Sequence, residues 1–410
     1  MSVTNAGRYV HRAFEWIESV AVDVPGGLGW LEDGQLYDDL YSGTAGVLLG
    51  CAEAAAYGID TARVAEGAAS RLLHLIERAP AATMPDDGLF SGWAGVAVAL
   101  RAWSAVTGDS RAAAGAAEVT AQIAGRVPRA PFDPARCTDV ISGDAGILLA
   151  LLADDSAFAA ANCLADRLVQ VAEPGSDGLQ WRMAVDGEFL MPGFSHGTAG
   201  VAYALAVAGH RLDRPDLITV AAQGAEALLA VGHSPDGWAV PLAIPARPSG
   251  PSVNFGWCHG PTGTVRLFLA LDAIDPQPRW QHAVGACVKA LHDSGLPARL
   301  RPGFWDNVAR CCGTAGVGQL VLDRYQDTGM LALLDWADIL ATDVLDRSIT
   351  SARGVTWSNT EHTRTPSELP PEPGFMHGAA GIAGWLARLD ALHTDRGTAR
   401  SPVGPGLPWL

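Results

Sequence analysis

This sequence of 410 residues lacks any run of Lys and Arg, and acidic residues outnumber basic ones by 44 to 28. The formal net charge is −16. Because a nucleic-acid groove needs clustered positive charge, we do not expect a nucleic-acid partner. The excess of acidic residues is better explained by a general role in solubility than by a negatively charged surface that binds a basic partner.

Long apolar runs are also missing. The apolar stretches fall short of the roughly 18 residues that a membrane span needs. Residues 1–22 mix apolar side chains with Arg8, Arg12 and Glu15, which predicts an amphipathic helix instead of a signal peptide. We therefore expect a cytoplasmic protein without a membrane span.

Cysteine is sparse, since seven in a chain of this length are too few for a disulfide framework. Cys51, Cys163 and Cys287 lie in apolar helical segments and are expected to be inert core residues. The composition, 49% hydrophobic and 18% charged, is typical of a globular protein with a large core. Three other cysteines lie within a repeated motif.

One short motif, YSGTAGVLLG in its first copy, recurs seven times with variations. Its first glycines are Gly43, Gly92, Gly143, Gly197, Gly260, Gly313 and Gly378. Successive copies are 49 to 65 residues apart, which leaves room for two helices and their connections. Each Gly-x-x-Gly opens an apolar run such as residues 47–56, and an amphipathic segment such as residues 63–78 follows it.

This alternation predicts an all-α fold, an α/α toroid of seven inner and seven outer helices. The glycines let neighbouring helices approach closely, and the apolar runs are buried on most sides while the amphipathic helices lie outside. We predict a single toroid domain over residues 1–394 and a Pro/Gly-rich tail over residues 395–410. An open solenoid is the alternative, but the absence of a polar capping repeat favours closure.

The residue just before the first glycine changes its type along the chain. In the first three units it is serine, an ordinary helix N-cap. In the last four units the same position holds His196, His259, Cys312 and His377. Because equivalent repeat positions lie at equivalent places around a ring, we expect thiols and imidazoles to gather at one rim.

Three cysteines from two adjacent units suit a metal site. Cys258 comes from the fifth unit, and Cys311 and Cys312 come from the sixth. Three thiolates can hold zinc tetrahedrally while one coordination position stays open. A closed site with His259 as fourth ligand and a site without metal are the alternatives. An iron–sulfur cluster fits less well because it would want four thiolates at wider separations.

The motifs GWCHGPTGT, RCCGTAG and SHGTAG resemble those of lanthionine synthetase C-like proteins, and the resemblance runs over roughly residues 35–390. It implies an α/α toroid with zinc on Cys258, Cys311 and Cys312, as in the variant whose zinc is held by three cysteines. This chain departs from the family at one position. Some members have an arginine four residues before the first zinc cysteine, and this chain has Asn254 there.

The same resemblance implies acid/base roles for His196 and for Asp139 in CTDVISG. The residues themselves support His196 better, because an imidazole at the rim faces the expected cavity. A lone aspartate before a repeat is usually a cap or a solvated side chain.

The implied reaction adds a cysteine thiolate of a precursor peptide to a dehydroalanine or dehydrobutyrine and forms a thioether ring. The chain shows no glycine-rich phosphate loop and no catalytic aspartate loop, so a separate dehydrating enzyme is implied as a partner. One alternative is a relative that adds glutathione or another free thiol to dehydrated proteins. Another is a non-catalytic scaffold of a biosynthetic complex.

Several residues near the motifs keep two interpretations. His259 and His377 could orient a zinc-bound sulfur or contact substrate, or could simply bond a backbone carbonyl. Asp306 and Asn307 could hydrogen-bond the zinc thiolates. The irregular segment 353–374 is long for an ordinary connection and could be a substrate loop over the rim or a plain surface loop.

Overall fold

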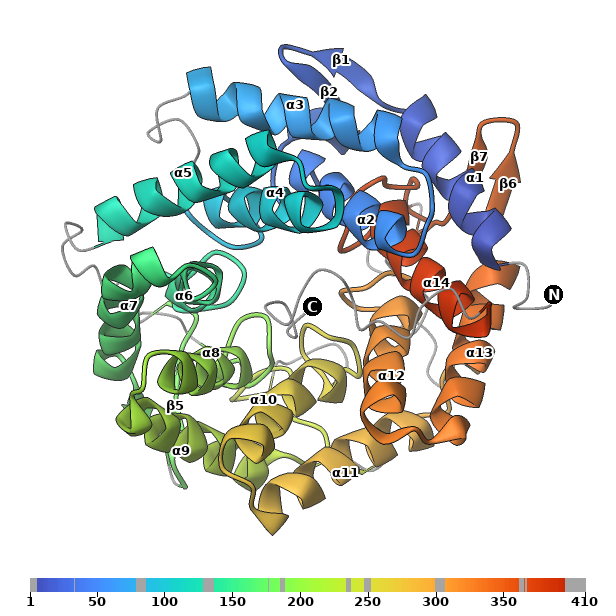
Figure 1. Ribbon diagram of the computed structural model, residues 1–410. Helices are drawn as coiled ribbons and strands as arrows, with labels where there is room; N and C mark the ends of the chain where they lie inside the picture. The colour runs from blue at the N-terminus through green and yellow to red at the C-terminus, as the bar shows by residue number, and fades with distance from the viewer. Residues whose placement is uncertain are drawn as a thin grey trace.

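The seven apolar runs form seven inner helices that stand around the centre of the molecule (Figure 1). They are buried on almost every side; in the first of them every residue from Thr44 to Ala54 is buried. The inner helices are α2 (Thr44–Ala56), α4 (Trp93–Thr107), α6 (Asp144–Leu151), α8 (Thr198–Arg211), α10 (Pro261–Ile274), α12 (Thr314–Thr328) and α14 (Ala379–His393).

The amphipathic segments form the outer ring. The outer helices are α1 (Ala6–Ser19), α3 (Ala62–Arg78), α5 (Ser110–Arg126), α7 (Phe158–Gln170), α9 (Pro215–Val231), α11 (Pro278–Asp293) and α13 (Leu331–Asp346). The first helix of the chain packs against the last, α14, and completes the outer ring. The predicted α/α toroid of seven inner and seven outer helices is confirmed.

The computed structural model describes residues 6–32, 34–78, 86–127, 136–175, 177–184, 189–233, 237–246, 252–298, 307–360, 365 and 367–394. The tail that we predicted over residues 395–410 lies outside them. Its separation from the toroid domain stays a prediction.

The ring is closed. Each inner helix contacts the next one along the chain, and α14 contacts α2. An open solenoid would leave the first and last inner helices apart, so that alternative is wrong. Closure removes the two apolar ends that a solenoid of this composition would expose to water.

The first glycine of each motif, and not the serine before it, is the N-cap of its inner helix. A Cβ on Gly43 would lie 2.4 Å from the carbonyl oxygen of Tyr37, because the incoming loop folds tightly over the helix start. The second glycine is needed for the same reason, since a Cβ on Gly263 would lie 2.0 Å from the carbonyl oxygen of Trp257. The expectation that the serines cap these helices is therefore wrong.

Three short antiparallel sheets follow outer helices α1, α7 and α13, and the sequence analysis did not predict them. Their strands are β1 (Val22–Val24), β2 (Gly27–Glu32), β3 (Gln35–Tyr37), β4 (Glu173–Pro174), β5 (Leu179–Gln180), β6 (Ile349–Ser351) and β7 (Gly354–Thr356). Beside each sheet an indole N–H donates to a helix carbonyl 13 residues earlier: Trp30 to Ile17, Trp181 to Leu168 and Trp357 to Val344.

The segment 353–374 begins as strand β7 and not as a loop over the rim. Gly354, with φ +139°, lies so close to α1 that a Cβ would come within 2.3 Å of the carbonyl oxygen of Arg12. Further along, Asn359 Nδ2 donates to the backbone oxygen of His377 at 2.7 Å. This part of the segment therefore supports the last unit; residues 361–364 and 366 lie outside the described residues.

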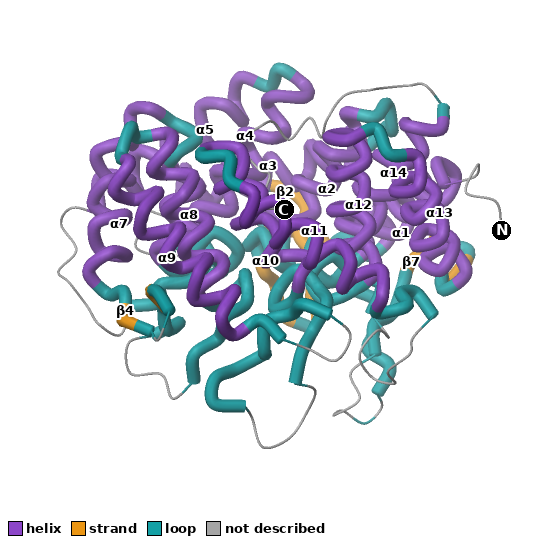
Figure 2. Tube along the Cα trace, turned by 90° about the horizontal axis from the view of Figure 1, so that it is seen from below, coloured by secondary structure: helices purple, strands orange, loops and turns teal. Residues whose placement is uncertain are grey.

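Long connections lead from outer to inner helices on one face of the ring, and shorter turns join inner to outer helices on the other. Figure 2 shows these loops gathered on the lower side of the molecule. Every glycine motif lies at the end of such a connection, so all seven motifs share this face. Among the described residues, no helix has both the length and the apolar character needed to cross a bilayer.

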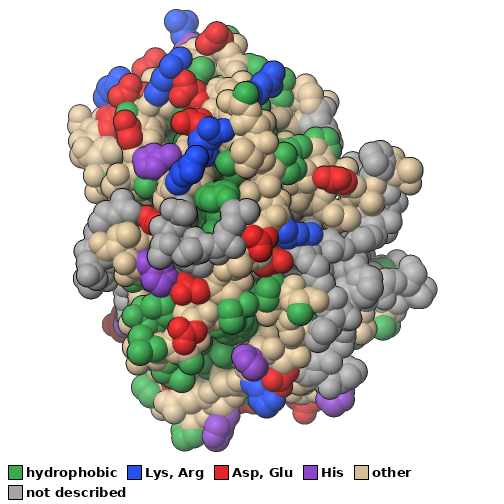
Figure 3. Space-filling view, turned by 90° about the vertical axis from the view of Figure 1, so that its right-hand side faces the viewer, with side chains coloured by type: hydrophobic (Ala, Val, Ile, Leu, Met, Phe, Trp, Pro, Cys, Tyr) green, Lys and Arg blue, Asp and Glu red, His purple; other side chains and the backbone are tan. Residues whose placement is uncertain are grey.

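Figure 3 shows apolar, acidic and basic side chains mixed on one side of the ring, so neither positive nor negative charge dominates this surface. Leu331 and Ile339 of α13 and the N-cap residue Met330 are 68%, 56% and 57% exposed.

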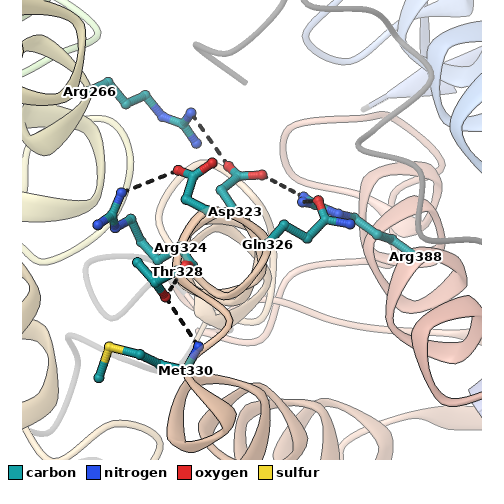
Figure 4. Close-up of polar contacts among 8 residues, drawn as sticks. Arg266, Asp323, Arg324, Gln326, Thr328, Met330 and Arg388 are labelled. Carbon is teal, nitrogen blue, oxygen red and sulfur yellow. Dashed lines mark hydrogen bonds and ion pairs between the residues drawn. The ribbon is translucent and has the colours of Figure 1, made fainter. Parts of the chain in front are cut away.

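A buried polar network ties the inner helices together (Figure 4). Asp323 of α12 accepts a hydrogen bond from Arg388 of α14 at 2.7 Å, and Arg266 of α10 lies 3.9 Å away. Nearby, Arg310 pairs with Glu53 of α2 at 2.5 Å. Arg310 and Glu53 are both buried, so losing either partner would leave an uncompensated buried charge, whereas Asp323 is partly exposed.

Candidate functional site

A ring of backbone hydrogen bonds holds the seven motifs in register. The residues two positions before the first glycines are Tyr41, Phe90, Ile141, Ser195, Cys258, Cys311 and Met376. In six of the seven links the N–H of one such residue donates to the carbonyl of its equivalent in the next unit, at 2.8 to 3.2 Å. In the remaining link the donor is Val140, at 3.1 Å from the oxygen of Ser195. The last link, from Met376 to Tyr41, closes the ring.

A cavity of about 600 Å³ lies at this ring of bonds. The chemically active residues of the motifs meet in it, although they come from units spread over the whole chain. Its lining includes Tyr41, His196, Asn254, Cys258, His259, Cys311, Cys312 and His377. Ser42 and Ser91, which do not cap helices, also line it.

The three cysteines of the fifth and sixth units form a compact cluster in this cavity. Cys312 Sγ lies 3.5 Å from Cys258 Sγ and 3.4 Å from Cys311 Sγ, and all three sulfurs lie within 4.8 Å of one another. Zinc–sulfur bonds of about 2.3 Å at tetrahedral angles place sulfurs about 3.8 Å apart. The cluster could therefore hold a metal ion, and its donor set suits zinc.

The three thiols shift one another's pKa. Hydrogen bonds from Cys258 and Cys312 hold the pKa of Cys311 well below its usual value. The bonds that Cys258 makes to the other two sulfurs, together with its burial, raise its own pKa. The pKa of Cys312 is also raised, because its bond to Cys311 and its burial outweigh the bond from Cys258. One thiolate is thus favoured in the free site, and metal binding would displace the remaining protons.

His196 and Asp139 form a hydrogen-bonded pair across two units. Asp139 is fully buried, and its Oδ2 lies 2.6 Å from His196 Nδ1. Its Oδ1 accepts hydrogen bonds from the backbone N–H groups of Ser142 and Gly143 at 2.9 and 2.8 Å. Asp139 is therefore a loop cap, as the plainer interpretation expected, and also the partner of the histidine. Because Nδ1 is engaged, Nε2 is the nitrogen of His196 left to face the cavity.

The other residues noted in the sequence have different surroundings. His259 lines the cavity with its ring 5.8 Å from that of His196. Asn254 uses its side-chain oxygen to accept from the N–H of Gly256 at 2.6 Å, which folds the loop before Cys258. Asn307 accepts from the N–H of Thr360 at 3.1 Å with its side-chain oxygen. Asp306, which we considered as a partner of the thiolates, lies outside the described residues.

Tyr41 is a site residue that the sequence analysis missed. Its hydroxyl donates to Cys311 Sγ at 3.0 Å and lies 2.9 Å from His377 Nε2. Burial and the negative charges of Cys311 and Cys312 raise the pKa of Tyr41 well above its usual value, so the hydroxyl keeps its proton. Burial lowers the pKa of His377, but its hydrogen bond to Cys312 and the negative charges of Cys312 and nearby glutamates together outweigh burial and raise it overall. The signal was present in the repeat, because Tyr41 occupies the same motif position as Cys258 and Cys311.

The sequence model of one protein family, described as lanthionine synthetase C-like protein, matches residues 34–398. No curated protein matches the sequence significantly.

Several solved structures share the fold. A structure titled nisin cyclase superposes with a TM-score of 0.61 at 14% sequence identity, covering 89% of this chain and 91% of that one. The Lin0763 protein from Listeria innocua gives a TM-score of 0.52 at 11% identity, covering 96% of this chain and 98% of that one. An unsaturated glucuronyl hydrolase specific for heparin gives 0.50 at 11% identity, with the same coverage. At these identities the likeness concerns the fold alone.

Proposed function

Since this chain belongs to the lanthionine synthetase C-like family, we propose that it is a zinc-dependent peptide cyclase. Its substrate would be a precursor peptide in which serine or threonine residues have been dehydrated. The reaction would add a cysteine thiol of that peptide to the β-carbon of a dehydroalanine or dehydrobutyrine and form a thioether ring. A separate enzyme would have to carry out the dehydration.

One observation carries the proposal: a three-thiol cluster and His196 line the same cavity, and the buried Asp139 is hydrogen-bonded to that histidine. Cys258, Cys311 and Cys312 would hold the zinc. When bound, zinc would lower the pKa of the substrate thiol and present it as a thiolate. A free thiol with a pKa of about 8.5 is mostly protonated at neutral pH and reacts slowly.

His196 would move the proton that the addition requires. As the new C–S bond forms at the β-carbon, the electron pair of the double bond moves to the α-carbon, which must then be protonated. His196 Nε2 can supply this proton, and it can take up the one that the thiol loses, so the ring forms without net proton transfer. Asp139 holds the imidazole in this orientation through Nδ1, and its own carboxylate is fixed by the amides of Ser142 and Gly143.

The direct test is ring formation on a dehydrated peptide. Purified protein loaded with zinc is incubated with a peptide that contains one dehydroalanine and one cysteine, and no thiol is added. We expect the free thiol to disappear without a change of mass, followed by alkylation and mass spectrometry. If the peptide reacts only when glutathione is present, the free-thiol alternative replaces the cyclase; if it reacts under neither condition, the scaffold alternative does.

We predict that Cys312→His keeps zinc but slows cyclisation. Three cysteinate charges against the +2 of zinc leave the site at −1, whereas two cysteinates and a neutral imidazole leave it at zero. The bound nucleophile is more electron-rich in the wild type, so we expect the variant to be about tenfold slower, the effect of roughly 1.4 kcal/mol on a barrier. Single-turnover rates at matched zinc content measure this, and an equal or faster rate in the variant would contradict it.

A further inference from the structure

The hydrogen bonds around the Tyr41 hydroxyl have a fixed direction. Its oxygen lies 3.0 Å from Cys311 Sγ and 2.9 Å from His377 Nε2. A tyrosine hydroxyl has one proton, and a thiolate can only accept, so the proton is directed at Cys311 once that cysteine is a ligand. The second bond must then run from the Nε2–H of His377 to the tyrosine oxygen.

This arrangement is held by backbone and ring contacts. Cys311 N–H donates to the oxygen of Met376 at 2.9 Å, and Met376 N–H donates to the oxygen of Tyr41 at 3.0 Å. The Tyr41 ring meets that of His377 edge-on, with centroids 4.9 Å apart, and that of Phe90 at 6.3 Å. The phenol therefore points at the sulfur without needing to move.

The proposed reaction creates a problem of selectivity. Three protein thiolates and one substrate thiolate would lie beside one electrophilic double bond. If Cys311 attacked, its sulfur would bond to the β-carbon, the electron pair of the double bond would move to the α-carbon, and a proton from water would complete the adduct. The protein would then lose a metal ligand.

We propose that Tyr41 protects Cys311 from this attack and keeps it as a ligand. The inference rests on the proposed function, since it concerns which of several thiolates reacts. A hydrogen bond with an ionised acceptor is strong, and it withdraws electron density from the sulfur and lowers its nucleophilicity. Tyr41 is on this account a positioning residue, because it touches a ligand and not the reacting atoms.

The experiment compares zinc-loaded wild type, Tyr41→Phe and Tyr37→Phe in acrylamide, a small electrophilic alkene. Tyr37 is the matched control, because it lines the same cavity but is 39% exposed and belongs to strand β3. Peptide mass spectrometry follows addition at each cysteine, and a chromogenic chelator follows release of zinc. We expect addition at Cys311 to be about tenfold faster in Tyr41→Phe, the order of effect for a hydrogen bond to a charged group. In Tyr37→Phe the rate should stay at the wild-type value.

Two further readouts separate this role from simple structural support. In cobalt-substituted protein the sulfur-to-metal charge-transfer band should shift to lower energy in Tyr41→Phe, since a thiolate without its hydrogen bond gives up an electron more easily. A fluorinated tyrosine at position 41 is a stronger donor and should slow the addition below the wild-type rate, which a merely structural residue would not do.

Equal rates at Cys311 in wild type and Tyr41→Phe, with both proteins loaded with zinc, would overturn the inference and leave the cyclase proposal intact. If Tyr41→Phe does not fold or hold zinc, the fluorinated protein decides: an unchanged or faster rate overturns the inference. A wild type that holds no zinc after loading would overturn both proposals.

Discussion

Cys311→Ala should purify with almost no zinc, whereas the wild type should carry about one zinc per chain. Cys311 is 3% exposed, and its sulfur lies 3.4 Å from that of Cys312 and 3.0 Å from the hydroxyl of Tyr41. Removing one of three thiolates leaves two, and the lost bond cannot be replaced by a neighbouring cysteine because none is near. We expect zinc affinity to fall by at least about a hundredfold, and ring formation to be lost with it.

Metal analysis of both proteins after dialysis against a weak chelator measures this effect. Cys163→Ala is a suitable control, because Cys163 is a half-buried cysteine on outer helix α7, far along the chain from the cluster. Its zinc content should match that of the wild type. If Cys311→Ala kept its full zinc content, or if well-folded wild type had none, the three-cysteine site would be wrong.

The second large effect should appear in the histidine–carboxylate pair. His196→Asn should keep zinc but slow ring formation by a factor of about 10² to 10⁴, the usual contribution of a positioned acid or base. Asp139→Asn should slow it less, because the imidazole is still present but is no longer held by a carboxylate at Nδ1. Single-turnover ring formation is measured beside zinc content, so that a loss of metal is not mistaken for a loss of proton transfer.

Asp39→Asn is the matched control for this experiment. Asp39 holds the same motif position in the first unit, and its Oδ1 accepts from the N–H groups of Ser42 and Gly43 at 2.8 and 3.3 Å. The residue that corresponds to His196 in the next unit is Ser91, so Asp39 faces no histidine at that motif position. If Asp39→Asn slowed the reaction as much as Asp139→Asn, the role of Asp139 would be loop capping alone.

Much of the site could be predicted from the repeat because a closed ring converts position in a motif into position in space. Equivalent residues of successive units lie side by side, so cysteines at matching positions of the fifth and sixth units had to be neighbours. The acid/base role of Asp139 was expected only through the family resemblance. A single aspartate before a glycine motif gives no sign of which carboxylate oxygen caps the loop and which faces the next unit.

The strands were missed for a different reason. Apart from β2, which has six residues, the described strands have two or three residues each, which is too short for an alternating pattern to be visible. These hairpins depend on the helix beside them, where a tryptophan N–H closes each one on a carbonyl 13 residues earlier. Such strands are stabilised by tertiary packing and carry little local signal.

The sequence by itself determined the toroid, since seven apolar runs behind tight glycine motifs can all be buried only when their helices close into a ring. It also determined that thiols and imidazoles gather at one rim. Only the tertiary structure decided which side chains meet near the point of closure, where Tyr41 lies against Cys311 although 270 residues separate them. The repeat fixes where a residue lies within its unit, but the direction of a side chain and the neighbour it meets across the closure depend on packing between distant parts of the chain.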